Sequence, residues 1–207
     1  VDIEVDGGVN LQNVEEIKQA GANVFVAGTK IFKGNVEENI KNTFLNPTSV
    51  LFEEPENLLK QEVREPALYN AIITAMATGA SRMAEISTKV GENTSVCSTY
   101  LKNLMMLGLV RKETPYGEKT SRKTIYAIED NLFRFWYRFV PENSSVIGRG
   151  AADLAYKRIE PFLPDYMGKV FEDICQQYLW KLLLDGDSPV EFRNLGRWWG
   201  TDPVTRS

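Results

Sequence analysis

Between residues 66 and 107 the apolar positions recur at helical spacing in three blocks that glycines separate. Pro66 suits the first position of a helix over Ala67–Ala77, and Gly79 ends that helix. Ser81 is a candidate cap for the next helix, with Glu85 placed to complete a reciprocal cap. Gly91 supplies a tight turn, and a third helix, capped by Asn93 or Thr94, runs to about Leu107. The expected inner faces consist of Leu68, Ile72, Ile73 and Met76, then Met83, Ile86 and Val90, then Val96, Tyr100, Leu101, Leu104 and Met105.

A hairpin is expected directly after these helices. Leu109–Lys112 and Thr124–Ile128 have strand character, and a polar, charged loop over residues 113–123 joins them. Three helices followed by a hairpin with a charged loop predict a winged helix-turn-helix domain, because spacing, caps and glycine breaks agree.

The first forty residues follow a different pattern. An alternating strand from Val1 to Val5 meets a glycine turn, and Leu11–Gly21 has helical spacing closed by a glycine. Val24–Ala27 is a short, continuously apolar segment typical of buried parallel strands, and Val36–Ile40 indicates a further short helix. The order strand, helix, strand, helix predicts a piece of an α/β fold.

The remaining segments are read as a linker and a final α/β portion. Residues 42–65 are polar, contain Pro47 and Pro55, and are expected to form a linker without a core. An aromatic helix over residues 130–140 is expected to end at Pro141, with a loop over residues 144–150. Helices are expected over residues 156–163 and 167–184, and a strand begins at Val190.

Composition excludes several classes of function. The 207 residues contain no histidine, which removes every Ser/His/Asp or Cys/His triad and every histidine metal site. No apolar run approaches the length of a membrane span. The net charge is −4, yet residues 66–140 carry ten basic and six acidic side chains. The basic middle of the chain therefore indicates a candidate surface for an acidic partner.

Residues 1–41 resemble the C-terminal end of ribulose-phosphate 3-epimerase, a TIM barrel. The resemblance rests on Glu4-Val5-Asp6-Gly7-Gly8-Val9 and on Val24-Phe25-Val26-Ala27-Gly28-Thr29. It implies that Asp6 is a metal ligand and an acid/base catalyst acting on a pentulose 5-phosphate, with a divalent metal as cofactor. It also implies that a sugar phosphate is held at Gly7, Gly8, Gly28 and Thr29, where Thr29 replaces the usual Ser. Two strands of eight and no histidines predict an inactive fragment.

Residues 43–207 resemble the C-terminal part of an archaeal and bacterial family of AAA-type P-loop ATPases. The resemblance rests on the segments Glu65-Pro66-Ala67-Leu68-Tyr69, Lys123-Thr124-Ile125-Tyr126, Phe133–Phe139, Tyr166–Glu172 and Gly196–Gly200. It implies a winged helix followed by a PD-(D/E)XK-like domain, here truncated, and a parent that uses ATP and Mg. Glu172 would match a first acidic metal ligand, although a helix-surface acid is the simpler interpretation. No G-x-x-x-x-G-K-[ST] phosphate loop occurs in the sequence.

The candidate nucleic-acid contacts combine small polar residues on the third helix with a basic wing. They are Ser95, Ser98, Thr99, Lys102, Lys119, Arg122 and Lys123, supported by Arg111 and Lys112 on the leading strand. Double-stranded DNA is the first expected partner, and a protein partner is the alternative, because winged helices also dock proteins. The aromatic residues of 133–139 fit core packing better than base stacking, and the same holds for Trp198 and Trp199.

The sequence therefore predicts a mixed α/β and α+β chain with no complete catalytic site. Its expected parts are an epimerase-like barrel fragment (1–41), a linker (42–65), a winged helix-turn-helix with a trailing aromatic helix (66–140) and a truncated PD-(D/E)XK-like domain (141–207). The two resemblances meet near residues 39–42, which leaves open a natural gene fusion or an artefact of assembly. Both parent families are expected to be cytoplasmic.

Overall fold

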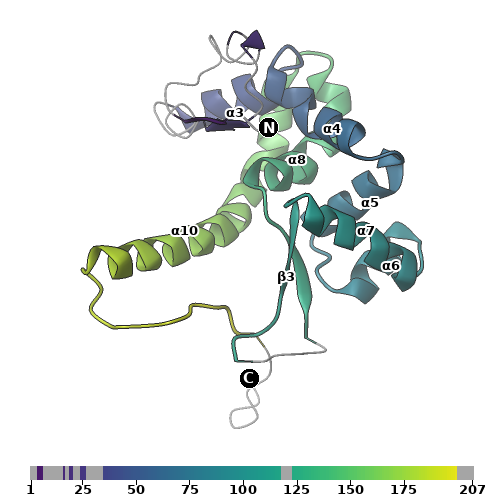
Figure 1. Ribbon diagram of the computed structural model, residues 1–207. Helices are drawn as coiled ribbons and strands as arrows, with labels where there is room; N and C mark the ends of the chain where they lie inside the picture. Colours follow the sequence, from purple (N-terminus) through teal and green to yellow (C-terminus); the bar gives the residue numbers. More distant parts are fainter. Residues whose placement is uncertain are drawn as a thin grey trace. The chain divides into compact units, whose positions relative to one another are not determined.

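The described part of the chain is mostly helical and contains two separate two-stranded sheets (Figure 1). The computed structural model describes residues 4–6, 16, 19–20, 24–26, 35–117 and 123–199. Two compact units divide the chain, one of residues 1–64 and 135–161 and the other of residues 65–134 and 162–207. A mixed composition of helix and strand was expected and is confirmed. Each unit is therefore built from two separate segments of the chain.

In the first unit, β1 (Glu4–Asp6) pairs in parallel with β2 (Val24–Val26), with Asp6 beside Val26. Helix α3 (Val36–Phe44) follows, and the Asn35 side chain caps it by accepting from the backbone N–H of Glu37 at 3.0 Å. The expected junction at residues 39–42 lies inside this one continuous helix.

The segment expected to be a linker instead forms helix α4 (Val50–Glu62) and contributes to a core. Leu45, Leu59 and Pro55 are buried, and Pro55 lies within the helix. The expectation of a linker relied on prolines and acids. It was wrong because some of the apolar side chains between them, among them Phe44 and Leu59, are buried and supply a core.

Helix α8 (Asn131–Ile147) supplies the other side of this core. The ring centroids of Phe44 and Phe135 lie 4.5 Å apart, and the Trp136 indole N–H donates to the Phe52 carbonyl at 2.6 Å. Helix α9 (Ala152–Ile159) adds Ala155, Tyr156 and Ile159, all buried. The aromatic residues of 133–139 thus form core, as expected, and not a stacking surface.

Helix α8 was expected to end at Pro141 but continues for six further residues. A proline inside a helix removes one backbone hydrogen bond and costs about 3 kcal/mol. Two observations explain why the helix persists. The buried stripe continues beyond the proline to Ile147, which is 0% exposed, and the Asn143 amide donates to the Phe139 carbonyl at 2.8 Å. Packing on both sides of Pro141 outweighs the lost bond.

The second unit begins with α5 (Pro66–Ala77), α6 (Met83–Val90) and α7 (Thr94–Met106), followed by β3 (Val110–Glu113) and β4 (Ile125–Ile128). The two strands pair antiparallel, with Val110 beside Ile128 (Figure 1). These elements occur in the expected order and close to the expected bounds. Arg82, rather than Ser81, is the N-cap residue of α6, while Glu85 accepts from the backbone N–H groups of both.

A short 3-10 helix, η1 (Glu160–Phe162), leads into α10 (Leu163–Asp185), which ends at Gly186 in the left-handed conformation with φ 80°. Helices were expected over residues 156–163 and 167–184. Helix α10 starts four residues earlier than expected, because Pro164 fits the first turn of a helix. The expected strand at Val190 does not form, and residues 190–192 lie outside the described helices and strands. Within the described residues, no helix has the length and apolar character required to cross a membrane.

Candidate nucleic-acid interface

A tight turn positions α7 on α6. Gly91 adopts φ 79°, a left-handed conformation that favours glycine, and its N–H closes α6 on the Ser87 carbonyl at 2.9 Å. Two residues later Asn93 caps α7 by accepting from the backbone N–H of Val96 at 2.9 Å. Cys97, Leu101 and Leu104 are each 0% exposed and fix the inner face of α7. The opposite face of this helix is therefore directed to solvent.

The outer face of α7 holds most of the helix residues predicted to contact nucleic acid. Ser95, Thr99 and Lys102 are exposed, and Ser98 is half-buried. The Ser95 hydroxyl donates to the Asn93 side chain at 2.6 Å, and the Thr99 hydroxyl donates to the Ser95 carbonyl at 3.2 Å. Lys102 is the charged donor on this face, and α7 contains no acidic residue to repel a phosphate.

The hairpin carries the rest of the predicted basic surface. Lys119 and Arg122 lie outside the described residues. Lys123 is half-buried, and its backbone carbonyl accepts the Trp199 indole N–H at 2.8 Å. Lys112 is exposed on β3. Trp198, expected in the core, is 57% exposed.

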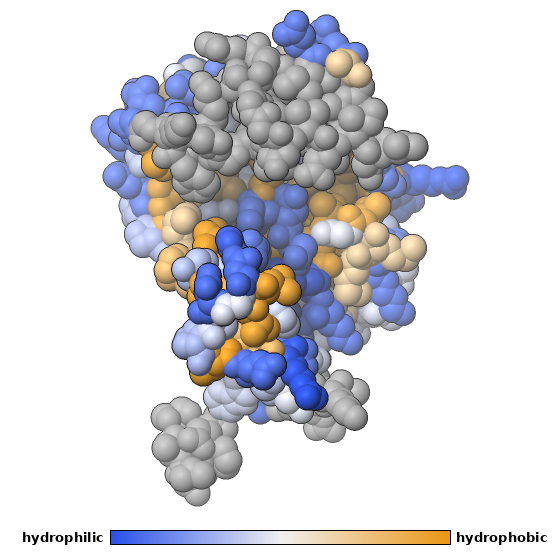
Figure 2. Space-filling view, turned by 60° about the vertical axis from the view of Figure 1, so that its left-hand side comes forward, coloured by the Kyte–Doolittle hydropathy of each residue, from blue (hydrophilic) through white to orange (hydrophobic). Residues whose placement is uncertain are grey.

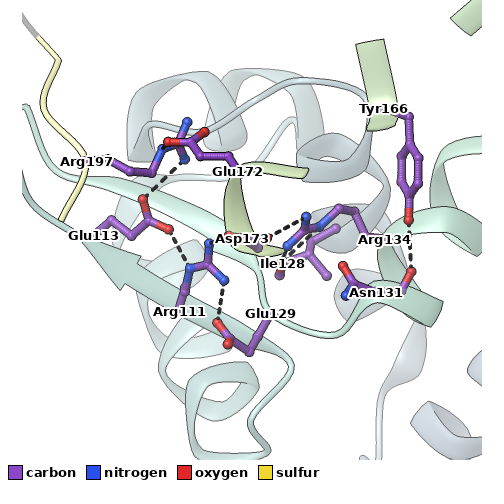
Figure 3. Close-up of polar contacts among 10 residues, drawn as sticks. All are labelled: Arg111, Glu113, Ile128, Glu129, Asn131, Arg134, Tyr166, Glu172, Asp173 and Arg197. Atoms are coloured by element: carbon purple, nitrogen blue, oxygen red, sulfur yellow. Dashed lines mark hydrogen bonds and ion pairs between the residues drawn. The ribbon is translucent and has the colours of Figure 1, made fainter. Parts of the chain in front are cut away.

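Arg111 does not belong to this exposed basic surface. Its guanidinium contacts three carboxylates at once: Glu113 through Nε, Glu129 at 2.9 Å and Asp173 at 3.0 Å (Figure 3). Arg111 and Glu113 share one face of β3 because alternate residues of a strand point the same way. That face is directed to α10, which carries Asp173.

Asp173 connects α10 to two other elements of the second unit. Its second oxygen accepts from Arg134 at 3.1 Å, and Arg134 also donates to the Ile128 carbonyl at 2.7 Å (Figure 3). Nearby, the Tyr166 hydroxyl donates to the Asn131 carbonyl at 3.2 Å. Asp173 is therefore the acceptor shared by β3 and the start of α8. We call Arg111, Glu113, Glu129, Arg134, Glu172, Asp173 and Arg197 the arginine cluster.

Two pKa shifts describe this environment. Burial alone would lower the pKa of Arg111, but the hydrogen bonds to Glu113 and Glu129 outweigh it and raise that pKa above its ordinary value. Burial raises the pKa of Tyr166 to about 12, against a smaller opposing effect of Arg134. Both shifts favour the protonated form, which for Arg111 is the charged form that pairs with the carboxylates. Sequence reasoning missed the arginine cluster, although the alternation of Arg111 and Glu113 was a usable signal.

Glu172, one of the two predicted metal ligands, has an arginine as its partner. The Glu172 carboxylate is paired with Arg197 at 2.7 Å. Among the described residues, no group of three or more His, Cys, Asp or Glu residues is arranged to hold a metal ion. A cavity of about 430 Å³ lies beside the cluster and is lined by Glu113, Glu129, Gln176, Gln177, Trp180 and Trp199 among others.

The epimerase-like residues are described only in part. Asp6 is the last residue of β1, while Gly7, Gly8, Gly28 and Thr29 lie outside the described residues. The donor set does not fit the metal of that family, because the sequence contains no histidine. We therefore derive no catalytic step from Asp6.

Comparison with known proteins gives different matches at the two ends of the chain. A family model described as archaeal and bacterial proteins of unknown function matches residues 136–203, and the ribulose-phosphate 3-epimerase family model matches residues 1–32. An uncharacterized protein of Methanocaldococcus jannaschii is 34% identical over 152 residues, which are 73% of this chain and 34% of that protein. The chain thus spans about a third of the length of this curated relative.

Among solved structures, the crystal structure of NadR in complex with 4-hydroxyphenylacetate is 16% identical. The similarity covers 62% of this chain and 83% of that chain with a TM-score of 0.31, which is too low to support a statement on fold or ligand. The comparisons therefore support two separate resemblances, a short epimerase-like one at the start and a longer one to a region of unknown function.

Proposed function

We propose that α5–α7 and the β3–β4 hairpin form a winged helix-turn-helix that binds double-stranded DNA. In this proposal they belong to the non-catalytic C-terminal region of a P-loop ATPase family protein. The observation that carries the proposal is the outer face of α7, which combines exposed Ser95, Thr99 and Lys102 with an absence of acids. Such a face enters a major groove without repelling the backbone, and the adjacent hairpin would follow the phosphates.

The proposal is tested by fluorescence anisotropy with a labelled mixed-sequence duplex at several salt concentrations. Binding should weaken steeply with salt, because each phosphate contact releases a counterion. Lys102→Glu should weaken binding about tenfold and flatten the salt dependence by roughly one counterion. Lys157→Glu is the matched control, since Lys157 is an exposed lysine on α9 in the other unit. A DNA affinity that changes neither with salt concentration nor with Lys102→Glu would exclude a DNA interface on α7.

A protein partner is the second candidate for the same domain. Met106 is 86% exposed and Leu107 is 38% exposed where α7 ends. Exposed apolar side chains at one helix end suit a protein surface better than a phosphate backbone. Met106→Glu separates the two candidates, because it should abolish protein docking while lowering DNA affinity only slightly.

The match over residues 1–32 favours a different, enzymatic candidate for the start of the chain. An active epimerase would exchange the proton next to the carbonyl of ribulose 5-phosphate with solvent, and Asp6→Asn would abolish that exchange. We expect no exchange by this chain, because the described residues contain two paired parallel strands where a barrel requires eight.

A further inference from the structure

Helix α10 has the opposite arrangement to an ordinary amphipathic helix. Its side toward the hairpin is largely polar and contains Glu172, Asp173 and Gln176, which join the arginine cluster or line the neighbouring cavity. Many of its apolar residues are exposed instead, and no residue of α10 is fully buried. In the space-filling view, apolar side chains gather in patches on the surface among hydrophilic ones (Figure 2).

Four of these exposed residues form a stripe: Met167, Phe171, Ile174 and Tyr178, which are 41%, 64%, 48% and 57% exposed. At 3.6 residues per turn they fall within about 60° of the helix circumference, roughly opposite the side that carries Asp173 and Gln176. Their spacing of four, three and four is that of the seam positions of a coiled coil. We call these four residues the α10 stripe.

We propose that the α10 stripe pairs with the α10 stripe of a second copy of this chain, with the two helices antiparallel. The stripe is self-complementary in that orientation, because Met167 lies beside the second copy's Tyr178, and Phe171 beside the second copy's Ile174. The same spacing continues to Lys181 and Asp185. In a parallel pair, Lys181 and Asp185 would each lie beside the same residue of the second copy, so that like charges would meet. An antiparallel pair keeps these like charges apart.

The exposed area is sufficient for a reversible dimer. The solvent-exposed parts of the Phe171 and Tyr178 side chains amount to roughly 400–600 Å² of accessible surface, summed over two copies. With Met167, Ile174 and the half-buried flanking residues Val170 and Leu182, the contact reaches about 1,000 Å², the lower limit of a specific interface. Interfaces of that size are typical of weak, transient association, so we expect a dissociation constant in the micromolar range, about 1–100 µM.

The proposal is tested by sedimentation velocity on the full chain over a concentration range that spans this constant. The wild-type chain should shift from monomer to dimer, and Ile174→Glu should shift the midpoint at least tenfold upward while leaving the far-UV circular dichroism unchanged. Leu154→Glu is the matched control, because Leu154 is 45% exposed on α9 and should leave the midpoint in place. A wild-type chain that stays monomeric throughout overturns the proposal, since another occupant would then cover the stripe.

A charge-swap experiment tests the contact directly and does not depend on loss of association. Phe171→Lys and Ile174→Glu should each be monomeric, and a mixture of the two should associate. The reason is that the antiparallel register brings the lysine introduced in one variant to the glutamate introduced in the other. Association should weaken at high salt. A mixture that stays monomeric contradicts the register.

Discussion

Helices α8 and α10 are both rich in aromatic residues, yet they differ in how they are fixed. In α8, Phe135, Trp136 and Phe139 are 7%, 7% and 4% exposed and pack within the first unit. In α10, Phe171 and Tyr178 are 64% and 57% exposed, and ion pairs attach the helix to the second unit. An apolar stripe in the sequence thus predicts which face of a helix becomes buried. It does not predict whether the covering residues belong to the described part of the same chain, as they do for α8 but not for α10.

The sharpest way to test this difference is to remove a tryptophan from α8. Trp136→Ala should lower the free energy of unfolding by about 3–5 kcal/mol, because it leaves a cavity and also deprives the Phe52 carbonyl of its donor. Urea unfolding followed by circular dichroism measures this loss. Trp198→Ala is the control, since Trp198 is 57% exposed and its removal should cost less than about 0.5 kcal/mol. Equal losses would refute the distinction between buried and exposed aromatics.

The ion pairs of α10 should have the next largest effect. Asp173→Asn removes the charge that Arg111 and Arg134 share, and all three side chains are less than a third exposed. We expect a loss of about 1–3 kcal/mol, because both guanidinium groups keep other partners.

Hydrogen exchange provides the readout specific to this cluster. Amides in the first half of α10 should exchange faster in Asp173→Asn, while those of α8 beyond Phe135 should not change. Asp187→Asn, at an exposed acid just beyond α10, is the control. Unchanged protection in α10 would mean that the arginine cluster does not hold the helix.

Much of the second unit could be predicted from the sequence, because its signals are local. Gly91, Asn93 and the periodic apolar residues of α7 specify a turn, a cap and a face without reference to distant residues. The order of α5–α7, β3 and β4 follows from such signals. Among the candidate contacts, the exposure of Ser95, Thr99 and Lys102 was also predictable from helical periodicity.

Several errors concern features that depend on packing and on partners that local sequence signals do not reveal. Pro141 does not end α8, because burial of Ile147 on the same stripe compensates for it. Arg111 was read as part of a phosphate surface, but Asp173, 62 positions later, engages it. A strand was expected to begin at Val190, yet a strand requires a partner that local sequence does not reveal.

The third prediction concerns a local feature, the start of α6. Glu85 accepts from the backbone N–H groups of Ser81 and Arg82, and these bonds lower the pKa of its carboxyl. A carboxyl group whose pKa is lower in the folded than in the unfolded state stabilises the fold at pH values above its unfolded-state pKa, which is about 4.3 for Glu. This stabilisation is lost as the pH falls through the folded-state pKa. Glu85→Ala should therefore cost about 1 kcal/mol at pH 7, or 2–4 °C in Tm, and almost nothing near pH 3. Glu142→Ala, which removes an exposed acid of α8, is the matched control.

The smallest change in the free energy of unfolding is expected for a substitution in the α10 stripe itself. Ile174→Ala removes a side chain that is 48% exposed, so below the dimerisation range it should change the free energy of unfolding by less than about 0.5 kcal/mol. The matched change in α8 is Val140→Ala, because Val140 is 1% exposed, and there the loss of even a smaller side chain should exceed about 1 kcal/mol. Thermal unfolding of both variants at two concentrations distinguishes intrinsic stability from association, because only dimerisation makes Tm depend on concentration. If Ile174→Ala costs as much as Val140→Ala in the dilute monomer, α10 is packed within its own chain and the contrast with α8 does not hold.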